Sequence, residues 1–460
     1  MSHVIRAQLG ILLGTALAVT GCRDTDPIAP SYTGPQAKLG TASILATGPF
    51  AYVTNSGSNT VSVIATATNT VVATVAVDAF PDGVATTPDG AFAYVANAAS
   101  GTVSVIATAT NAVVATIGVG GMPLAVAITP DGARAYVASQ VSNTVSVIAT
   151  ATNSVVATIP VNSAPTGMAI TPDGAFAYLS VPPGEVAVIA TATNTVVATV
   201  AVPNAIGVAI KPSGTFAYVA SGCEPPCSTG TVAVIATVTN SIVSSVNLGV
   251  GPFGVAITPD GAFAYVTNAG SGTVSVIATA TNTVVATVPQ DLVPLGVAIT
   301  PDGAFAYVAN AGSNSVSVIA TATNSVVASV PVGSAPRGVA ITPRVGIQVA
   351  IDIKPGNDLN PIILVSNGRI PLAILSSAEF YAPADVNPAS LRFGRTGEET
   401  SLVSCNPGSH DVNADGRLDL VCHFRTQEAG FQADDTEGVL RGRTLSGTPI
   451  EGRDAVHIIR

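Results

Sequence analysis

The chain has no tryptophan, and none of its four histidines lies between residues 50 and 343. Copper and haem sites depend on His ligands, so this long stretch is a poor candidate for either. The same stretch holds ten acidic residues against three basic ones, Arg134, Lys211 and Arg337, a balance of three minus ten, or −7. Binding to nucleic acid relies on basic patches and is therefore disfavoured.

Charge is also scarce overall, since only 10% of the 460 residues are charged while 48% are hydrophobic. Yet after residue 22 no run approaches the roughly 20 unbroken apolar residues that a membrane-spanning helix needs. The hydrophobic residues instead form short Val, Ala and Ile runs that Thr, Asn, Gly or Pro interrupt. This pattern predicts many short strands joined by turns.

An internal repeat organises the central part of the chain. The tripeptide AYV or AYL recurs every 40 to 47 residues, at Tyr52, Tyr94, Tyr136, Tyr178, Tyr218, Tyr265 and Tyr307. Each unit contains four strand-like runs, which in one unit are residues 296–300, 305–310, 315–321 and 325–332. We label the four strands of a unit A to D. Four antiparallel strands per unit of this length are typical of a propeller blade.

Ring closure distinguishes a propeller from a linear solenoid. The first unit lacks a clear A strand, whereas a spare A strand, residues 337–343, follows the last unit. We expect this strand to complete the first blade, although residues 41–47 are an alternative. The fold class predicted is all-β: a seven-bladed β-propeller followed by a small β-sandwich-like domain.

The N-terminus has the pattern of an export signal, with Arg6 before an apolar segment and small residues before Cys22. The segment resembles a bacterial lipobox, which implies a lipid anchor on Cys22; an ordinary secretory signal is the alternative. We therefore expect a signal peptide over 1–21, a flexible tether over 22–40, the propeller over 41–344 and a C-terminal β domain over 345–460. The expected location is the cell envelope, with membrane attachment through the lipid only.

The remaining cysteines fall into two local pairs, Cys223 with Cys227 and Cys405 with Cys422. In an exported protein both pairs are expected to form disulfides, with free buried thiols as the alternative. The first pair, in the sequence CEPPC, is expected to stiffen a protruding loop. A redox role is disfavoured because its spacing differs from CxxC.

The repeat resembles the YVTN-type propeller family through Tyr52-Val53-Thr54-Asn55 and Tyr265-Val266-Thr267-Asn268. Members include surface-layer and envelope proteins of mostly undefined molecular function. The stretches IDIKPG, IPLAIL and DVNADGRLDLV resemble a C-terminal module that recurs on secreted bacterial proteins. These resemblances imply the fold and an extracytoplasmic setting, but no activity.

Sequence variation between the repeats is concentrated in the B–C and D–A connections, which antiparallel strands place on one face. Drift after duplication is an alternative explanation. Five Asp residues occupy a repeated PDG turn, where capping accounts for them. We therefore expect a non-enzymatic envelope binding protein or scaffold, whose partner is an unidentified envelope or extracellular protein or glycan. A lactonase-type propeller hydrolase is the alternative, and a surface-layer or adhesin-like component is a third.

One loop in the C-terminal region has metal-ligand spacing. Asp411, Asn413, Asp415 and Asp419 match a DxNxDGxxD calcium loop, in which Arg417 would contribute its backbone carbonyl. Position 12 is Cys422 rather than the Glu of an EF-hand, so a further acid is needed, and the candidates are Asp434, Asp435 and Glu437. The prediction is a structural calcium ion; a turn rich in Asp and Asn without metal is the alternative.

Overall fold

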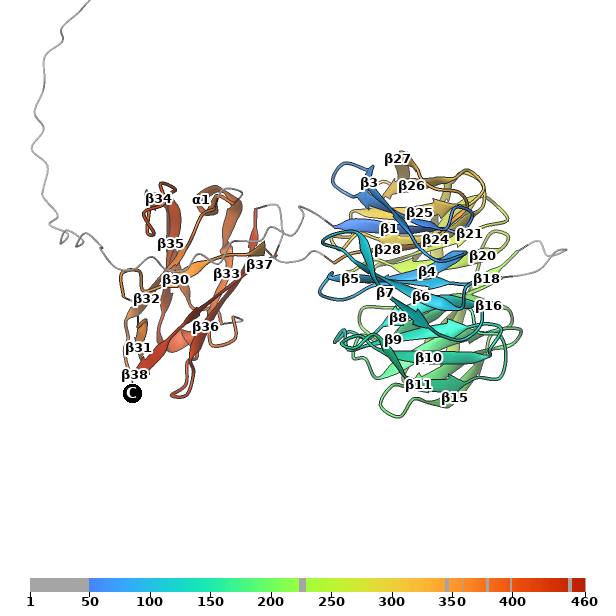
Figure 1. The fold of residues 1–460 in the computed structure, drawn as a ribbon, viewed down its shortest axis with the longest axis horizontal. Helices are drawn as coiled ribbons and strands as arrows, with labels where there is room; N and C mark the ends of the chain where they lie inside the picture. Colours follow the sequence, from blue (N-terminus) through green and yellow to red (C-terminus); the bar gives the residue numbers. More distant parts are fainter. Residues whose placement is uncertain are drawn as a thin grey trace, which may run out of the picture.

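A computed structural model describes residues 49–222, 229–343 and 347–459, apart from 358, 378–379, 398 and 446–448. The described chain is almost entirely β-structure, and Figure 1 shows stacked four-stranded sheets preceding a second β domain. The expected fold class, a seven-bladed propeller followed by a C-terminal β domain, is confirmed.

Each blade is one four-stranded antiparallel sheet in which neighbours in sequence pair, except in blade 1. Blade 1 contains β28 (Pro336–Ile341), β1 (Phe50–Asn55), β2 (Thr60–Ala65) and β3 (Thr70–Ala76). Blade 2 contains β4 (Pro81–Thr86), β5 (Phe92–Asn97), β6 (Thr102–Ala107) and β7 (Ala112–Gly118). Blade 3 contains β8 (Pro123–Ile128), β9 (Arg134–Ser139), β10 (Thr144–Ala149) and β11 (Ser154–Pro160). Blade 4 contains β12 (Met168–Ile170), β13 (Phe176–Val181), β14 (Glu185–Ala190) and β15 (Thr195–Ala201).

The last three blades repeat the pattern. Blade 5 contains β16 (Ala205–Ile210), β17 (Phe216–Ser221), β18 (Thr231–Ala236) and β19 (Ser241–Asn247). Blade 6 contains β20 (Pro252–Ile257), β21 (Phe263–Asn268), β22 (Thr273–Ala278) and β23 (Thr283–Pro289). Blade 7 contains β24 (Pro294–Ile299), β25 (Phe305–Asn310), β26 (Ser315–Ala320) and β27 (Ser325–Pro331). The four strands expected for this last unit agree with the structure to within two residues.

The ring closes by pairing of the two ends of the propeller. Strand β28 is antiparallel to β1, with Ala51 opposite Ile341 and Val53 opposite Val339. The closing strand is therefore the one that the sequence indicated. The alternative first strand, residues 41–47, lies outside the described residues. Closure covers the edge of β1, which would otherwise be open to pairing with another chain.

The repeated tyrosine holds each blade to the next. All seven side chains are buried, and each hydroxyl donates a hydrogen bond to the Asn that ends the C–D turn of the following blade. Tyr52 donates to Asn111 at 2.7 Å, and Tyr307 donates to Asn69, which completes the circle. Each of these Asn residues has a positive φ, which Asn tolerates better than most residues. The AYV and TATN motifs thus form one repeated contact between blades.

The innermost strand of each sheet contacts the innermost strands of both neighbouring sheets, which forms a ring around the axis. These seven inner strands are β28, β4, β8, β12, β16, β20 and β24. Five of them have Gly at the third position, and Gly167 takes the equivalent place just before β12. A Cβ atom on any of these glycines would overlap a backbone carbonyl oxygen of the inner segment of the next blade; the six are Gly83, Gly167, Gly207, Gly254, Gly296 and Gly338. Glycine is required here because the backbones approach closely.

The outermost strand of each blade has an irregularity that limits edge pairing. In blade 1 the register between β2 and β3 shifts after Val63, so Val72 is an extra residue without a partner. The equivalent shift occurs in all seven blades. Such bulges twist an edge strand away from further pairing, which protects the valine-rich rim.

The C-terminal domain has two four-stranded sheets. One contains β29 (Ile347–Gln348), β37 (Pro449–Ala455), β36 (Glu437–Thr444) and β33 (Val386–Gly394). The other contains β30 (Ile351–Ile353), β32 (Arg369–Ile374), β35 (Asp419–Arg425) and β34 (Leu402–His410). Strands β31 (Pro361–Ile363) and β38 (His457–Ile459) form a small parallel pair, and α1 (Ala382–Asp385) and a 3-10 turn (Gln427–Ala429) complete the domain.

A single hydrophobic core joins the two large sheets of this domain. It includes Leu440 from one sheet and Leu372 and Phe424 from the other. Cys405 and Cys422, which face each other in β34 and β35, are joined by a disulfide at the edge of this core. Among the described residues, no helix is long and apolar enough to cross a membrane.

Candidate functional site

The two faces of the propeller differ in the connections that they present. The D–A and B–C connections lie together on one face, because the backbone N–H of Ala98 donates to Phe80 and that of Ser56 donates to Ala335. The A–B and C–D turns lie on the other. We call the first the variable face and the second the constant face. The predicted concentration of sequence differences on one side of the ring therefore corresponds to a physical surface.

An ion pair lies where the inner strands of blades 1 and 2 begin at the variable face. Nε of Arg337, the second residue of β28, is 2.9 Å from Oδ2 of Asp82, the second residue of β4. The Arg337 guanidinium also lies over the Phe80 ring, 5.4 Å from its centroid. The Asp82 side chain is 12% exposed and that of Arg337 is 27% exposed. A ligand at the surface can therefore reach the guanidinium more easily than the carboxylate.

The backbone around this pair is fixed by Thr54. Its hydroxyl donates to the carbonyl oxygen of Asp82 at 2.5 Å and accepts from the N–H of Gly338 at 2.8 Å. One side chain of β1 therefore links the inner strands of blades 1 and 2. A reactive pair is most effective when its backbone is held in this way, because little reorganisation is then needed during reaction.

Burial raises the pKa of the Asp82 carboxyl, and the neighbouring Arg337 opposes that rise. A carboxylate whose pKa moves toward neutrality becomes a better general base, since it holds the proton more tightly after accepting it. A guanidinium beside it can stabilise a developing oxyanion. The pair therefore combines a group that can act as a general base with a group that can stabilise an oxyanion.

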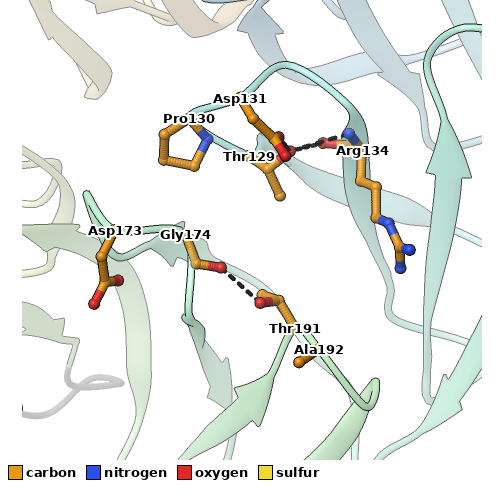
Figure 2. A pocket seen from close by; sticks show the side chains of 8 residues that line it. All are labelled: Thr129, Pro130, Asp131, Arg134, Asp173, Gly174, Thr191 and Ala192. Carbon is orange, nitrogen blue, oxygen red and sulfur yellow. Dashed lines mark hydrogen bonds between the residues drawn. The ribbon is translucent and has the colours of Figure 1, made fainter.

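Figure 2 shows a different site, a depression of about 180 Å³ on the constant face between blades 3 and 4. Asp131 and Asp173 come from the PDG turns of the two blades, and Arg134 occupies a position that is Phe in the other repeats. Asp131 accepts from the Thr129 hydroxyl at 2.5 Å and from the Ala133 N–H at 2.9 Å.

The hydrogen bonds within these turns make the two carboxylates of the depression weaker bases. The threonine hydroxyl, followed by the backbone N–H, lowers the pKa of Asp131 and likewise that of Asp173. Both carboxylates are therefore weak bases that are used to hold their own turns. This agrees with the turn-capping role predicted for the PDG aspartates.

The expected calcium loop follows β34 and leads into β35. Asp411 accepts from the N–H groups of Asp415 and Gly416, while Asp415 accepts from that of Arg417. Asp419 is fully buried, with its two oxygens accepting from Ser376 and Val412. Asn413 also accepts from Asp415, at 3.2 Å. Within the part of the chain that the structure describes, no three acidic, Cys or His side chains gather to hold a metal ion, and calcium binding stays a prediction.

Two of the three further acids considered for calcium, Asp435 and Glu437, pair with arginines instead. Asp435 pairs with Arg395 at 3.0 Å, and Glu437 pairs with Arg453 at 2.7 Å. The expected lipidation site Cys22 and the expected pair Cys223 and Cys227 lie outside the described residues.

The sequence contains a signal for the Asp82–Arg337 pair, although neither residue was among the predicted site residues. Both residues follow a proline at the first position of an inner strand, where other repeats have Leu124 or Phe253. Once β28 is placed in blade 1, these two positions become neighbours. Combining the ring closure with the repeat alignment would have identified the pair.

Comparison with known proteins gives one family match. A family model described as lactonase, 7-bladed beta-propeller, matches residues 236–350, about a quarter of the chain. No curated protein matches the sequence.

Solved structures show the same fold. Hydrazine synthase of Kuenenia stuttgartiensis is 28% identical, with a TM-score of 0.54, and the match covers 59% of this chain and 92% of that one. A putative 6-phosphogluconolactonase from Bacteroides uniformis is 16% identical, with a TM-score of 0.55, 64% of this chain covered and 99% of that one. A functionally unknown protein from Desulfotomaculum acetoxidans is 19% identical, with a TM-score of 0.57 and the same coverage.

The lactonase match corrects the function expected from the sequence. The scarcity of charged residues in the propeller predicts a non-enzymatic binding protein or scaffold. The family match overturns that reading and favours the alternative, a propeller hydrolase. The reason for the error is physical: a reactive site needs two or three converging groups, so a low overall charge does not exclude one.

Proposed function

We propose that the propeller is a lactonase-type hydrolase whose reactive pair is Asp82 and Arg337. The observation that carries this proposal is the match of the lactonase family model to residues 236–350, a segment that includes Arg337. The chemistry of the pair supports it, because a buried carboxylate and a more accessible guanidinium meet at the variable face.

The proposed reaction adds water to the acyl carbon of a lactone. Asp82 takes a proton from the attacking water while Arg337 stabilises the negative charge that develops on the carbonyl oxygen. When the tetrahedral intermediate collapses, the bond between the acyl carbon and the ring oxygen breaks, and the proton returns to that oxygen. The product is one hydroxy acid, whose carboxylate can pair with Arg337 before release.

Ring opening of simple lactones by the purified full chain tests the proposal, with acid release as the readout. Asp82→Asn keeps the side-chain shape but removes the base, and we expect a loss of about 100-fold or more. Arg337→Gln should cause a comparable loss. Asp131→Asn, in the depression of the constant face, is the matched control and should retain activity. Absence of turnover by the wild type, or full activity of Asp82→Asn, would overturn the proposal.

We further propose that the protein is exported and lipid-anchored at Cys22, with repeats related to the YVTN type. Three residues of that motif each make their own side-chain hydrogen bonds, which supports its importance. Tyr52 donates to Asn111 and Thr54 donates to the carbonyl oxygen of Asp82. Asn55 donates to Thr60 and Ser62. A Cys22→Ser variant should be released from the membrane fraction. Unchanged fractionation would contradict the anchor.

We also propose that Asp411, Asn413, Asp415 and Asp419 form a structural calcium loop with the Arg417 carbonyl. The repeated use of these side chains to shape one loop supports this. An ion that binds only the folded state would add about 2.7 kcal/mol at one hundred times its dissociation constant. Thermal melts of the full chain with calcium and with chelator should differ, and an Asp411→Ala variant should abolish the difference. Identical melts of the wild type would exclude a stabilising ion.

A further inference from the structure

The D–A connections of the variable face contain an unusual choice of residues. Phe80, Met122, Val293 and Ala335 have φ values of 56°, 58°, 58° and 50°, in the left-handed region. Side chains with a Cβ atom are strained in this region, and β-branched valine is the most strained of the four. Equivalent connections elsewhere in the ring use Asn204 or Gly251, which suit the same backbone better.

A backbone hydrogen bond explains the left-handed conformation of these residues, but it does not explain why their side chains are apolar. In each connection the carbonyl of the left-handed residue accepts from the N–H of the following B–C turn, as Phe80 does from Ala98 and Val293 does from Ala311. Asn204 and Gly251 accept in the same way from Gly222 and Ala269. The hydrogen bond therefore requires the conformation and is indifferent to the side chain, so the apolar residues need another explanation.

The strained residues occupy consecutive positions around the ring. Their connections join blades 6 and 7, 7 and 1, 1 and 2, and 2 and 3, whereas Asn204 and Gly251 follow blades 4 and 5. Phe80, Met122 and Val293 are 37%, 38% and 42% exposed. Leu292 and Val141, exposed beside them, extend the surface, because Val141 donates its N–H to Gly121 next to Met122. We name Phe80, Met122, Val141, Leu292 and Val293 the apolar arc.

The apolar arc curves around the Asp82–Arg337 pair. Asp82 follows Phe80 of the arc by two residues, and Arg337 follows Ala335 by two residues, so two of the four strained connections lead directly into the strands that carry the pair. The connections of Met122 and Val293 lie next to these two around the ring. The Arg337 guanidinium contacts the Phe80 ring, so the ion pair and the apolar arc adjoin each other. A surface with an accessible cation bordered by aliphatic side chains complements a molecule with a polar acyl end and an aliphatic body.

We propose that the apolar arc binds the aliphatic chain of an acyl lactone, with the ester group at Asp82 and Arg337. This inference rests on the proposed function and specifies its substrate class. It explains why three of the four strained connections carry large exposed apolar side chains, those of Phe80, Met122 and Val293: the apolar contact area is retained at a cost in backbone strain. A small sugar lactone would leave most of the arc uncovered.

Direct binding separates this proposal from catalysis. Titration calorimetry with decanoate and butanoate, which share a carboxylate and differ in chain length, measures the contribution of the arc without turnover. We expect decanoate to bind at least about tenfold more tightly, since each methylene that enters an apolar site adds affinity. A Met122→Asn/Val293→Asn double variant, which mimics Asn204, should lose most of that preference.

The same variant tests the strain argument through its stability. Asn tolerates the left-handed region better than Met or Val. The melting temperature of the double variant should therefore equal or exceed that of the wild type. Val238→Ala is the matched control: Val238 is 89% exposed in a C–D turn of the constant face, and its loss should leave decanoate binding unchanged. A marked fall in the melting temperature of the double variant would overturn the inference that the arc serves binding.

Other outcomes identify other occupants of the arc. Sedimentation that shows a dimer in the wild type and a monomer in the double variant would make the arc a contact between copies of this chain. Co-sedimentation with phosphatidylcholine vesicles that the double variant loses would make it a membrane contact. Either result, or equal binding of decanoate and butanoate, overturns the proposal. Decanoate binding without opening of either a short or a decyl-chain lactone would instead reject the proposed hydrolase and leave the binding site standing.

Discussion

The constant and variable faces of the propeller use the same repeats for different ends. On the constant face, each C–D turn ends in an Asn that receives a tyrosine hydroxyl from the preceding blade. On the variable face, equivalent positions hold residues as different as Asp82, Leu124 and Arg337. The repeated tyrosine–asparagine contact between blades therefore lies at the constant face, whereas the variable face also links blades but with residues that differ from one repeat to the next, as Thr54 and the Asp82–Arg337 pair do.

The largest loss of stability is expected when the closure of the ring is broken, because both faces depend on that closure. Deleting residues 336–341 removes β28 and exposes the inner edge of β1. Since the blades otherwise contact only their neighbours, we expect loss of cooperative unfolding and aggregation, measured by calorimetry and light scattering. Deleting residues 41–47 is the control and should be mild, because β28 already occupies that edge. The reverse result would show that closure depends on another strand.

A smaller effect is expected from single contacts of the constant face. Asn153→Ala leaves the buried Tyr94 hydroxyl without its acceptor and places alanine at a φ of 49°. We expect a loss of about 2–4 kcal/mol in the free energy of unfolding. Tyr94→Phe removes the hydroxyl instead and should cost only about 1 kcal/mol. Denaturant unfolding compares the two variants, and equal losses would contradict the unsatisfied-hydroxyl explanation.

Alkaline pH should weaken the same contacts together. Burial raises the pKa of Tyr52, Tyr265 and Tyr307 to about 12, against an ordinary value of 10.0. Folding favours the neutral phenol, so this stabilisation is complete below the unfolded pKa and is lost as pH rises toward the folded value. Tyrosinate absorbance should rise for these residues only near pH 12, with melting temperature falling above about pH 10. Normal titration of all tyrosines in the folded protein would contradict their burial.

The smallest effect is expected on the variable face. Val141→Ser changes an exposed side chain, and its effect on the free energy of unfolding should stay within about 0.5 kcal/mol. Chemical denaturation of this variant beside Asn153→Ala gives the sharpest contrast between the faces. A large loss in Val141→Ser would mean that the variable face also supports the ring.

The fold was predictable because its signals are local and repeated. The spacing of the AYV motifs gave the number of blades, and the unmatched A strand at residues 337–343 indicated how the ring closes. The partner of the tyrosine hydroxyl was not predictable, since Tyr52 and Asn111 are 59 residues apart and lie in different blades. The candidate site was missed for a similar reason: Asp82 and Arg337 become neighbours only after the ends of the ring meet.

The pairing of β1 with β28 also sets the order in which the molecule can assemble. Ala51 pairs with Ile341, 290 residues later, and closing a loop of that length costs about 5 kcal/mol in chain entropy. Blades 2 to 7 each consist of consecutive strands and can form as the chain emerges, but blade 1 must wait with three strands until residue 341 is available. The Asp82–Arg337 pair joins β28 of blade 1 to β4 of blade 2, so it depends on the same closing strand. Within the propeller, the Asp82–Arg337 pair would therefore form only after residue 341 is available to complete blade 1.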